Sequence, residues 1–179
     1  MNVIETRLPG VLVIEPKVHG DARGFFLETF RREAYREAGI ALEFVQDNHS
    51  RSRRGVLRGL HSQAVRPQGK LVRCPRGEVF DVAVDINPAS PTFSQWVGEM
   101  LSDENHRQMW IPPGYAHGFL VLSEVADFEY KCTDYYAPEH EFGVAWNDPQ
   151  VSIDWPIEHP SLSAKDSALP TLAELVGSR

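Results

Sequence analysis

Residues 78–86 read Glu-Val-Phe-Asp-Val-Ala-Val-Asp-Ile, and this stretch decides the class of fold. Within it, one set of side chains alternates with another: Phe80, Val82, Val84 and Ile86 with Val79, Asp81, Ala83 and Asp85. A period of two places successive side chains on opposite faces of a strand. The stretch therefore predicts a β-strand with one apolar face.

Short apolar runs of the same kind lie on either side of it, at 11–14, 119–122 and 128–133. Turn signals rich in Pro, Gly and Asn separate them, at 67–69, 75–77, 87–88, 112–114 and 147–149. Short strands spaced about ten residues apart are typical of a sandwich or barrel, here a jelly roll. Helices are expected only near 31–38 and 172–176. The chain shows no repeat, low-complexity linker or break in composition, so we expect one domain over residues 1–179.

The overall composition excludes several classes of protein. The chain has 179 residues, 24% charged and 42% hydrophobic, which is ordinary for a folded protein. A formal charge of −7 argues against a general nucleic-acid binder. No apolar run reaches the roughly 20 residues of a membrane helix, so no membrane association is expected. Residues 1–10 do not resemble a signal peptide, and there are only two cysteines, so we expect a cytoplasmic protein.

Basic residues are concentrated in one part of this acidic chain. Between His49 and Gly77 there is no Asp or Glu, but the segment holds eight of the eighteen basic residues: Arg51, Arg53, Arg54, Arg58, Arg66, Lys70, Arg73 and Arg76. Such a block suggests a site for a small anionic ligand, because arginine binds two phosphate oxygens at once. The alternative is a solvated loop and strand edge. No aromatic side chain lies in the segment to stack on bases, which disfavours nucleic acid.

Residues 112–117, Pro-Pro-Gly-Tyr-Ala-His, resemble the second motif of cupin barrels, in which a turn leads into a strand with an inward histidine. The first cupin motif would supply two histidines one residue apart and then a glutamate. Here Gln63 stands in the place of the second histidine after His61, and no acid follows before Glu78. A catalytic metal site needs about three good ligands. We therefore expect a cupin barrel that has kept its pocket without a metal.

A pocket without a metal can still transfer protons, and His61 is the candidate base because the pKa of imidazole is about 6.5. The alternative is a histidine that is simply hydrogen-bonded in the core. Strand alternation places Arg58 on the opposite face from His61 unless a β-bulge intervenes at Gly59. A bulge there is typical of the rim of a binding site.

Longer motifs run in the same order along nearly the whole chain, at 21–26, 44–50, 58–61, 68–73, 77–82, 112–119, 130–136, 146–149 and 162–166. Together they resemble the dTDP-4-dehydrorhamnose 3,5-epimerases. The resemblance implies a homodimeric enzyme that inverts both carbons beside the ketone of a dTDP-4-keto-6-deoxyhexose, in the synthesis of activated L-rhamnose. It implies no cofactor, because the ketone itself acidifies the neighbouring C–H bonds.

The resemblance also implies roles for individual residues. His61 would remove a proton, Tyr130 would return one from the other face of the ring, and Asp166 would orient His61. Lys70 would stabilise the enolate oxygen. The implied substrate contacts are Arg23 and Arg58 on the pyrophosphate, Phe26 and Glu28 near the thymine from a neighbouring subunit, Tyr136 stacked on the base, and Gln46, Asn48, His117, Glu141 and Lys165. For Phe26 and Tyr136 the alternative is core or interface packing.

The sequence departs from the family at one motif, which usually reads His-Tyr-Gln where this chain has His61-Ser62-Gln63. On a strand Ser62 would point away from the face that carries His61. Four alternatives stay open at this stage. They are an epimerase acting on C3 or C5 alone, a sugar-nucleotide 3,4-ketoisomerase, a non-catalytic sugar-nucleotide binding protein and a metal-dependent cupin dioxygenase.

Overall fold

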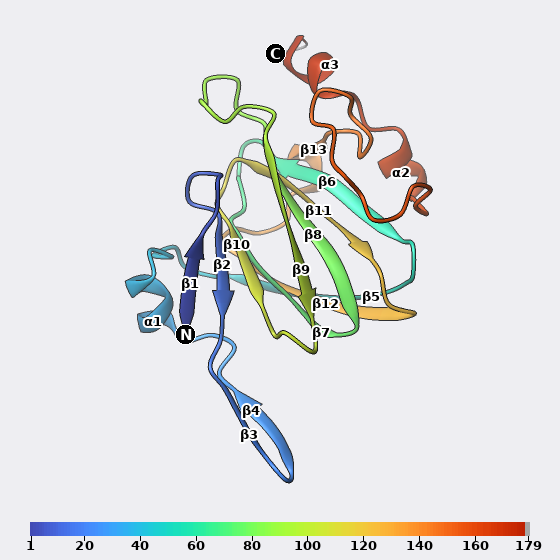
Figure 1. The fold of residues 1–179 in the computed structure, drawn as a ribbon. Helices are drawn as coiled ribbons and strands as arrows, with labels where there is room; N and C mark the ends of the chain where they lie inside the picture. Colours follow the sequence, from blue (N-terminus) through green and yellow to red (C-terminus); the bar gives the residue numbers. More distant parts are fainter. Residues whose placement is uncertain (178–179) are drawn as a thin grey trace.

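The computed structural model describes residues 1–177, which are built mainly from antiparallel strands (Figure 1). The alternating stretch at 78–86 forms β8 (Glu78–Asp85). It pairs on one side with β11 (Tyr115–Val121) and on the other with β9 (Trp96–Ser102). The prediction of a strand at this position is therefore confirmed, and the strand lies inside a sheet.

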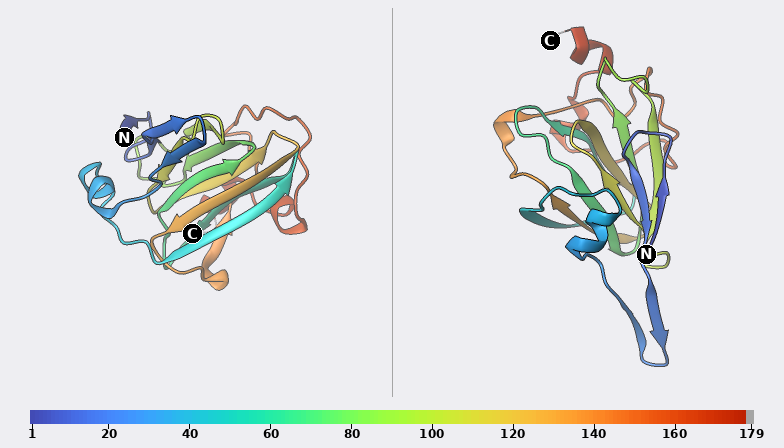
Figure 2. Two further views of the ribbon diagram at one scale, coloured as in Figure 1. Left: turned by 90° about the horizontal axis from the view of Figure 1, so that it is seen from below. Right: turned by 90° about the vertical axis from the view of Figure 1, so that its left-hand side faces the viewer.

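Two sheets face each other and form the jelly-roll barrel that was expected (Figures 1 and 2). The five-stranded sheet has the order β13-β6-β11-β8-β9 and adds β6 (Leu57–Gln63) and β13 (Glu141–Gly143) to the three strands above. The six-stranded sheet has the order β1-β2-β10-β7-β12-β5. Its strands are β1 (Asn2–Glu5), β2 (Leu12–Glu15), β5 (Gln46–Arg53), β7 (Lys70–Arg76), β10 (Gln108–Ile111) and β12 (Val125–Cys132).

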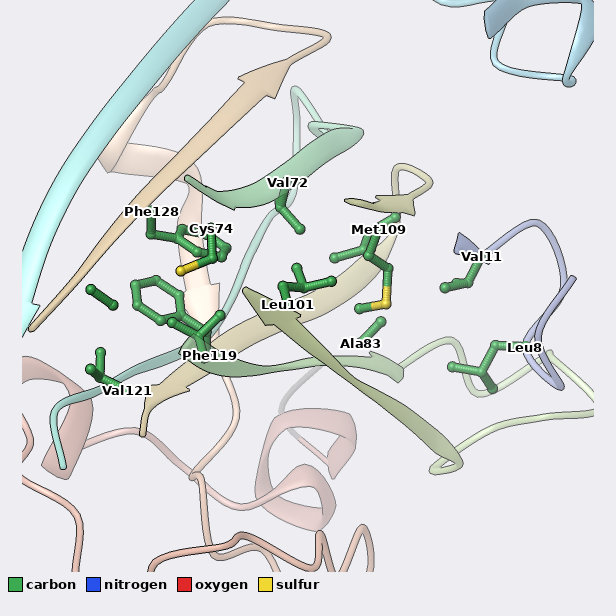
Figure 3. Packing of buried hydrophobic residues seen from close by; sticks show 13 residues of the cluster. Leu8, Val11, Val72, Cys74, Ala83, Leu101, Met109, Phe119, Val121 and Phe128 are labelled. Atoms are coloured by element: carbon green, nitrogen blue, oxygen red, sulfur yellow. The ribbon is translucent and has the colours of Figure 1, made fainter. Parts of the chain in front are cut away.

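A hydrophobic core fills one end of the space between the sheets (Figure 3). Val72 and Met109 from the six-stranded sheet pack with Leu101 from the other sheet. The rings of Phe119 on β11 and Phe128 on β12 stack with their centroids 4.0 Å apart. Because these two rings come from opposite sheets, their contact holds the sheets together. Both rings also line the cavity between the sheets.

The outer face of the five-stranded sheet is also buried. The segment after β13 folds back over it, so Val82 and Val84 pack with Trp155 and Leu172. The apolar face predicted for β8 is therefore the outer one, and the face with Asp81 lines the barrel interior. Both faces of β8 are therefore covered, and neither of its two alternating sets of side chains forms an open surface.

Both expected helices are present. Helix α1 (Arg32–Glu37) packs on the outer face of the six-stranded sheet, where the Tyr35 hydroxyl donates to Gln108 Oε1 at 2.7 Å. Helix α3 (Leu172–Gly177) packs within the C-terminal segment. The sequence patterns did not predict α2 (Ala164–Ser167) or the 3-10 turn η1 (Pro138–His140). Within residues 1–177, every helix is too short to cross a membrane.

Strands β3 (Val18–Asp21) and β4 (Gly24–Leu27) pair only with each other and form a separate hairpin. The hairpin extends away from the barrel at the end opposite α3 (Figures 1 and 2). Leu27 is half-buried, and the other side chains of the two strands are exposed, including the rings of Phe25 and Phe26.

Candidate active site

A cavity of about 560 Å³ lies between the two sheets. One wall comes from β5, β7 and β12 of the six-stranded sheet, and the other from β6 and β11 of the five-stranded sheet. Strand β13 and residues 161–166, which lead into α2, close one side. Most of the candidate site residues line this cavity: Gln46, Asn48, Arg58, His61, Lys70, His117, Tyr130, Tyr136, Glu141, Lys165 and Asp166.

Strand β6 has a bulge at Gly59, the condition under which the sequence would allow Arg58 and His61 to share a face. His61 is paired with His117 and Arg58 with Phe119, so β6 has two residues between these pairs where β11 has one, Gly118. The two backbones are close, because a Cβ built on Gly59 would lie 2.5 Å from the Gly118 Cα. The extra residue brings Arg58 and His61 to the same cavity.

His61 is held by a carboxylate from the C-terminal segment. Its Nε2 lies 2.6 Å from Asp166 Oδ1, and because a carboxylate only accepts, Nε2 carries the proton. Ser163 caps α2 by accepting from the Asp166 backbone N–H, which fixes the first turn that carries the carboxylate. Burial lowers the pKa of His61, and Asp166 opposes this shift. The imidazole is therefore neutral near pH 7, with the Nδ1 lone pair free to take a proton.

A second carboxylate, Glu141, lies on the other side of the imidazole, with its Oε1 3.8 Å from His61 Nδ1. Its Oε2 accepts from the Tyr136 hydroxyl at 2.6 Å and from the Lys165 ammonium. Burial raises the pKa of Glu141, but the hydrogen bonds from Lys165 and Tyr136 bring it below its ordinary value. The hydrogen bond to Glu141 raises the pKa of Tyr136 to about 12. These contacts tie the Tyr136 hydroxyl to the rim of the cavity.

The opposite wall carries Lys70 on β7 and Tyr130 on β12. Burial lowers the pKa of Lys70, and the carboxylates of Glu141 and Asp81 oppose that shift. Burial raises the pKa of Tyr130, which keeps its hydroxyl protonated at neutral pH. A neutral base on one wall therefore faces the Tyr130 hydroxyl and the Lys70 amino group on the other. A sugar ring between these walls would meet an acid and a base on opposite faces.

One buried carboxylate, Asp81, was not among the predicted site residues. It lies on β8 inside the barrel with no exposed surface, and its Oδ1 is 2.7 Å from His117 Nε2. The signal was present in the alternation, because Asp81 shares a strand face with Val79 and Ala83, both of them core residues. When an acidic residue alternates with core residues on one face of a strand and the other face is also apolar, both faces are expected to be buried. The carboxylate is then buried as well.

Residues 62 and 63 have structural roles in the wall of the cavity. The Gln63 amide donates to the Tyr135 carbonyl at 3.1 Å, and its oxygen accepts from the Ala137 N–H at 2.9 Å. Gln63 therefore fixes the segment that leads to Tyr136. Ser62 is buried and is paired with Phe142 of β13, whose ring packs with the outer cluster of the five-stranded sheet. In residues 1–177, no three His, Cys, Asp or Glu side chains are grouped as metal ligands.

The basic block divides between two environments. Arg58, held by the Ser52 hydroxyl at 3.0 Å, and Lys70 line the cavity. Arg51 and Arg73 instead pair with Asp127 and Glu129 on the outer face of the six-stranded sheet. Part of the block therefore lies where an anionic ligand could bind, and another part lies on the outer face of a strand.

Three candidate residues lie away from the cavity in a single chain. Arg23 is at the tip of the β3–β4 hairpin, 89% exposed, and pairs with Asp21. The Phe26 ring is 70% exposed on the same hairpin. Glu28 follows β4 and pairs with Arg31 at 3.3 Å. Their placement gives no substrate contact within one subunit.

Comparison with known proteins gives a consistent result. The family described as dTDP-4-dehydrorhamnose 3,5-epimerase matches residues 5–174. The chain is 61% identical to the dTDP-4-dehydrorhamnose 3,5-epimerase of Pseudomonas aeruginosa over 168 residues, 93% of each protein. It is 59% identical, with a TM-score of 0.94, to a crystal structure of dTDP-6-deoxy-D-glucose-3,5-epimerase from Legionella pneumophila in complex with dTDP-4-keto-L-rhamnose, covering 96% of this chain and 93% of that one.

A 3'-monoepimerase from Streptomyces bikiniensis, solved in complex with dTDP-quinovose, is more distant. The identity is 36% and the TM-score 0.90, covering 96% of this chain and 89% of that one. The match of sequence and fold extends over nearly the whole chain in each comparison. This protein therefore belongs to the dTDP-4-dehydrorhamnose 3,5-epimerase family.

Proposed function

We propose that this protein is a dTDP-4-dehydrorhamnose 3,5-epimerase, which inverts C3 and C5 of dTDP-4-dehydro-6-deoxy-D-glucose in dTDP-L-rhamnose biosynthesis. The observation that carries the proposal is the placement of His61, backed by Asp166, across one cavity from Tyr130 and Lys70. Epimerisation beside a ketone needs a base on one face of the ring and an acid on the other. Family membership supports the same reaction and substrate.

The reaction proceeds by proton transfers alone. Neutral His61 removes the proton beside the C4 ketone, and the C–H electron pair moves into an enolate. The Lys70 ammonium stabilises the enolate oxygen. The Tyr130 hydroxyl then delivers a proton to the opposite face, which inverts the carbon. His61 next gives up its proton and Tyr130 regains one by exchange with water, so the same groups act at the second carbon. Positioned acids and bases contribute about 10²- to 10⁴-fold in rate.

Binding of the nucleotide part would use the remaining polar groups of the cavity. Arg58 has a planar guanidinium suited to the pyrophosphate. Gln46 and Asn48 project from alternate positions of β5, and His117, Glu141 and Lys165 lie around His61. The Tyr136 ring, fixed by Glu141, is available to stack on the thymine. Each of these assignments rests on the resemblance together with the shared cavity.

We also propose that the protein is a homodimer in which each hairpin reaches the partner subunit. The hairpin exposes Phe25 and Phe26 next to each other in sequence, far more apolar surface than a free hairpin would keep in water. Arg23, Phe26 and Glu28 would then act on the partner's substrate. Analytical ultracentrifugation should show a dimer, and Phe26→Ser should weaken it. Leu42→Ser, at an exposed position outside the hairpin, is the control. A monomeric wild-type protein would contradict this arrangement.

We place the reaction in the cytoplasm. Cys74 and Cys132 are both free and buried, and a reducing compartment keeps such thiols unpaired.

The test of the main proposal is proton NMR of dTDP-4-dehydro-6-deoxy-D-glucose with the enzyme in D₂O. Deuterium should enter at both C3 and C5, and a partner reductase should trap the L-lyxo product. Label at C3 alone would identify an epimerase of one carbon and make Ser62→Tyr the first variant to examine. Tight nucleotide binding without exchange at either carbon would contradict an enzymatic role.

A further inference from the structure

The cavity contains two histidine–carboxylate pairs on adjacent strands. His61 on β6 and His117 on β11 are directly paired in the sheet, and both line the cavity. Each places Nε2 against a carboxylate oxygen, His61 at 2.6 Å from Asp166 and His117 at 2.7 Å from Asp81. The first pair belongs to the proton transfer described above. The second pair has no role in it so far.

Asp81 is unusual among the buried polar residues of the described chain. Its Oδ2 is the only fully buried side-chain nitrogen or oxygen in residues 1–177 that has no hydrogen-bond partner. A buried carboxylate oxygen without a donor is unfavourable, because the loss of its hydration is not compensated by a hydrogen bond. An apolar side chain of similar size would stabilise the barrel interior at least as well. Asp81 therefore needs a reason other than packing.

The geometry of His117 supplies that reason. Its ring stacks on Phe128, with centroids 6.0 Å apart and an angle of 17° between the planes. Asp81 accepts from Nε2–H, so in the neutral ring the lone pair is on Nδ1. Within the described residues Nδ1 has no hydrogen-bond partner, and it is not fully buried. Nδ1 is thus open to the cavity as a hydrogen-bond acceptor, held in place from behind by Asp81.

The sugar ring of the substrate has hydroxyl groups that could donate to this acceptor on only one side of the C4 ketone. In a 4-keto-6-deoxyhexose, hydroxyl groups are found at C2 and C3, whereas C5 carries a methyl group. Resting on the proposed function, we propose that Asp81 is a positioning residue that acts through His117. It holds Nδ1 so that it accepts a hydrogen bond from a hydroxyl on the C2–C3 side of the ring. This contact favours proton exchange at C3 without affecting C5 to the same degree.

The test compares deuterium exchange at the two carbons in Asp81→Asn, His117→Asn and the double variant, by proton NMR in D₂O. Asparagine keeps the size of the side chain but loses its charge and its obligatory acceptor role. We expect Asp81→Asn to slow exchange at C3 by roughly 10- to 100-fold, the loss found when the hydrogen-bond partner of a metal-bound histidine is removed. Exchange at C5 should stay close to wild type. The double variant should be no slower at C3 than His117→Asn alone, because Asp81 acts through that ring.

Asp85→Asn is the matched control. Asp85 lies on the same strand and is also buried, but its Oδ2 binds the Thr92 hydroxyl in the loop before β9, outside the cavity lining. This variant should leave the ratio of C3 to C5 exchange unchanged even if it lowers the melting temperature. The ratio therefore separates a local effect on the substrate from general damage to the strand.

Two results would overturn the inference. Equal slowing at C3 and C5 in Asp81→Asn would mean that the carboxylate acts on both steps, for instance through the charge of Lys70. Additive losses in the double variant would show that Asp81 does not act through His117. Both differ from failure of the proposed function, in which the wild-type protein itself would exchange neither carbon.

Discussion

His61 Nε2 lies 2.6 Å from Asp166 Oδ1, although 105 residues separate the two in the chain. The contact forms because the C-terminal segment folds over the five-stranded sheet and places α2 beside β6. The carboxylate fixes the proton on Nε2 and leaves Nδ1 as the basic atom. A base oriented in this way, buried and neutral, makes the dependence of the reaction on pH and on individual side chains predictable.

The acid limb of kcat/KM should have its midpoint below pH 6.5. Burial lowers the pKa of His61, so the fold favours the neutral imidazole that the reaction needs. As the pH falls through this lowered pKa, the ring becomes protonated and the rate declines. The profile is measured by following product formation with a coupled reductase at saturating coenzyme. A midpoint clearly above 6.5 would mean that another group controls this limb.

Asp166→Asn should move that limb to still lower pH and slow the reaction at its optimum. The hydrogen bond and charge of Asp166 raise the pKa of His61 against the effect of burial, so their removal lets it fall further. The maximal rate should drop by roughly 10- to 100-fold because the ring loses its orientation. Asp148→Asn, at a buried carboxylate that binds the Leu172 N–H, controls for loss of fold. An unshifted limb would argue against this pairing in solution.

His61→Ala should abolish deuterium exchange at both carbons and leave dTDP binding nearly unchanged. The base is removed, whereas Arg58 and the other groups around the cavity remain. Exchange is followed by NMR, and binding by calorimetry. His159→Ala, at an exposed position, should behave as wild type. Full turnover in His61→Ala would exclude this residue as the base.

Tyr130→Phe should separate proton exchange from inversion. His61 can still remove a proton and return a deuteron to the same face, so exchange persists with retention. Net inversion should fall by about 10²- to 10⁴-fold, because the other face has lost its acid. Comparing deuterium incorporation with product formation measures both rates in one sample. Equal losses in the two assays would contradict the division of roles between Tyr130 and His61.

Gly118→Ala should destabilise the protein by about 1–3 kcal/mol, the usual effect of overpacking. A Cβ at this position would lie 2.8 Å from the Arg58 carbonyl oxygen, at the bulge that brings Arg58 and His61 together. Urea denaturation measures the change in the free energy of unfolding. Gly177→Ala is the control, because nothing lies within 4 Å of its added Cβ. Equal stability of the two variants would show that the strands can separate at the bulge at little cost.

Much of the fold follows from local sequence. The alternation at 78–86 predicts β8, and the phase of Arg58 and His61 shows that the two can share a face only if β6 has a bulge at Gly59. Both depend only on the period of a strand, which the order of residues fixes directly. The resemblance of the longer motifs to a known family then predicted which polar side chains share the cavity. That succeeds because collinear motifs carry the spacing of a whole fold.

Only the tertiary structure decides which face of a strand is covered and by what. Alternation shows that Asp81 and Val82 lie on opposite faces of β8, but either face can be the inner one. Because the C-terminal segment covers Val82, the side of β8 that carries Asp81 lies inside the barrel. Asp81 can therefore pair with His117. The β3–β4 hairpin shows the opposite. Its strands pair locally, but no part of the barrel packs over Phe26, which stays exposed. Periodicity sets the direction of each side chain, whereas its environment depends on segments that are distant in the chain and meet only when it folds.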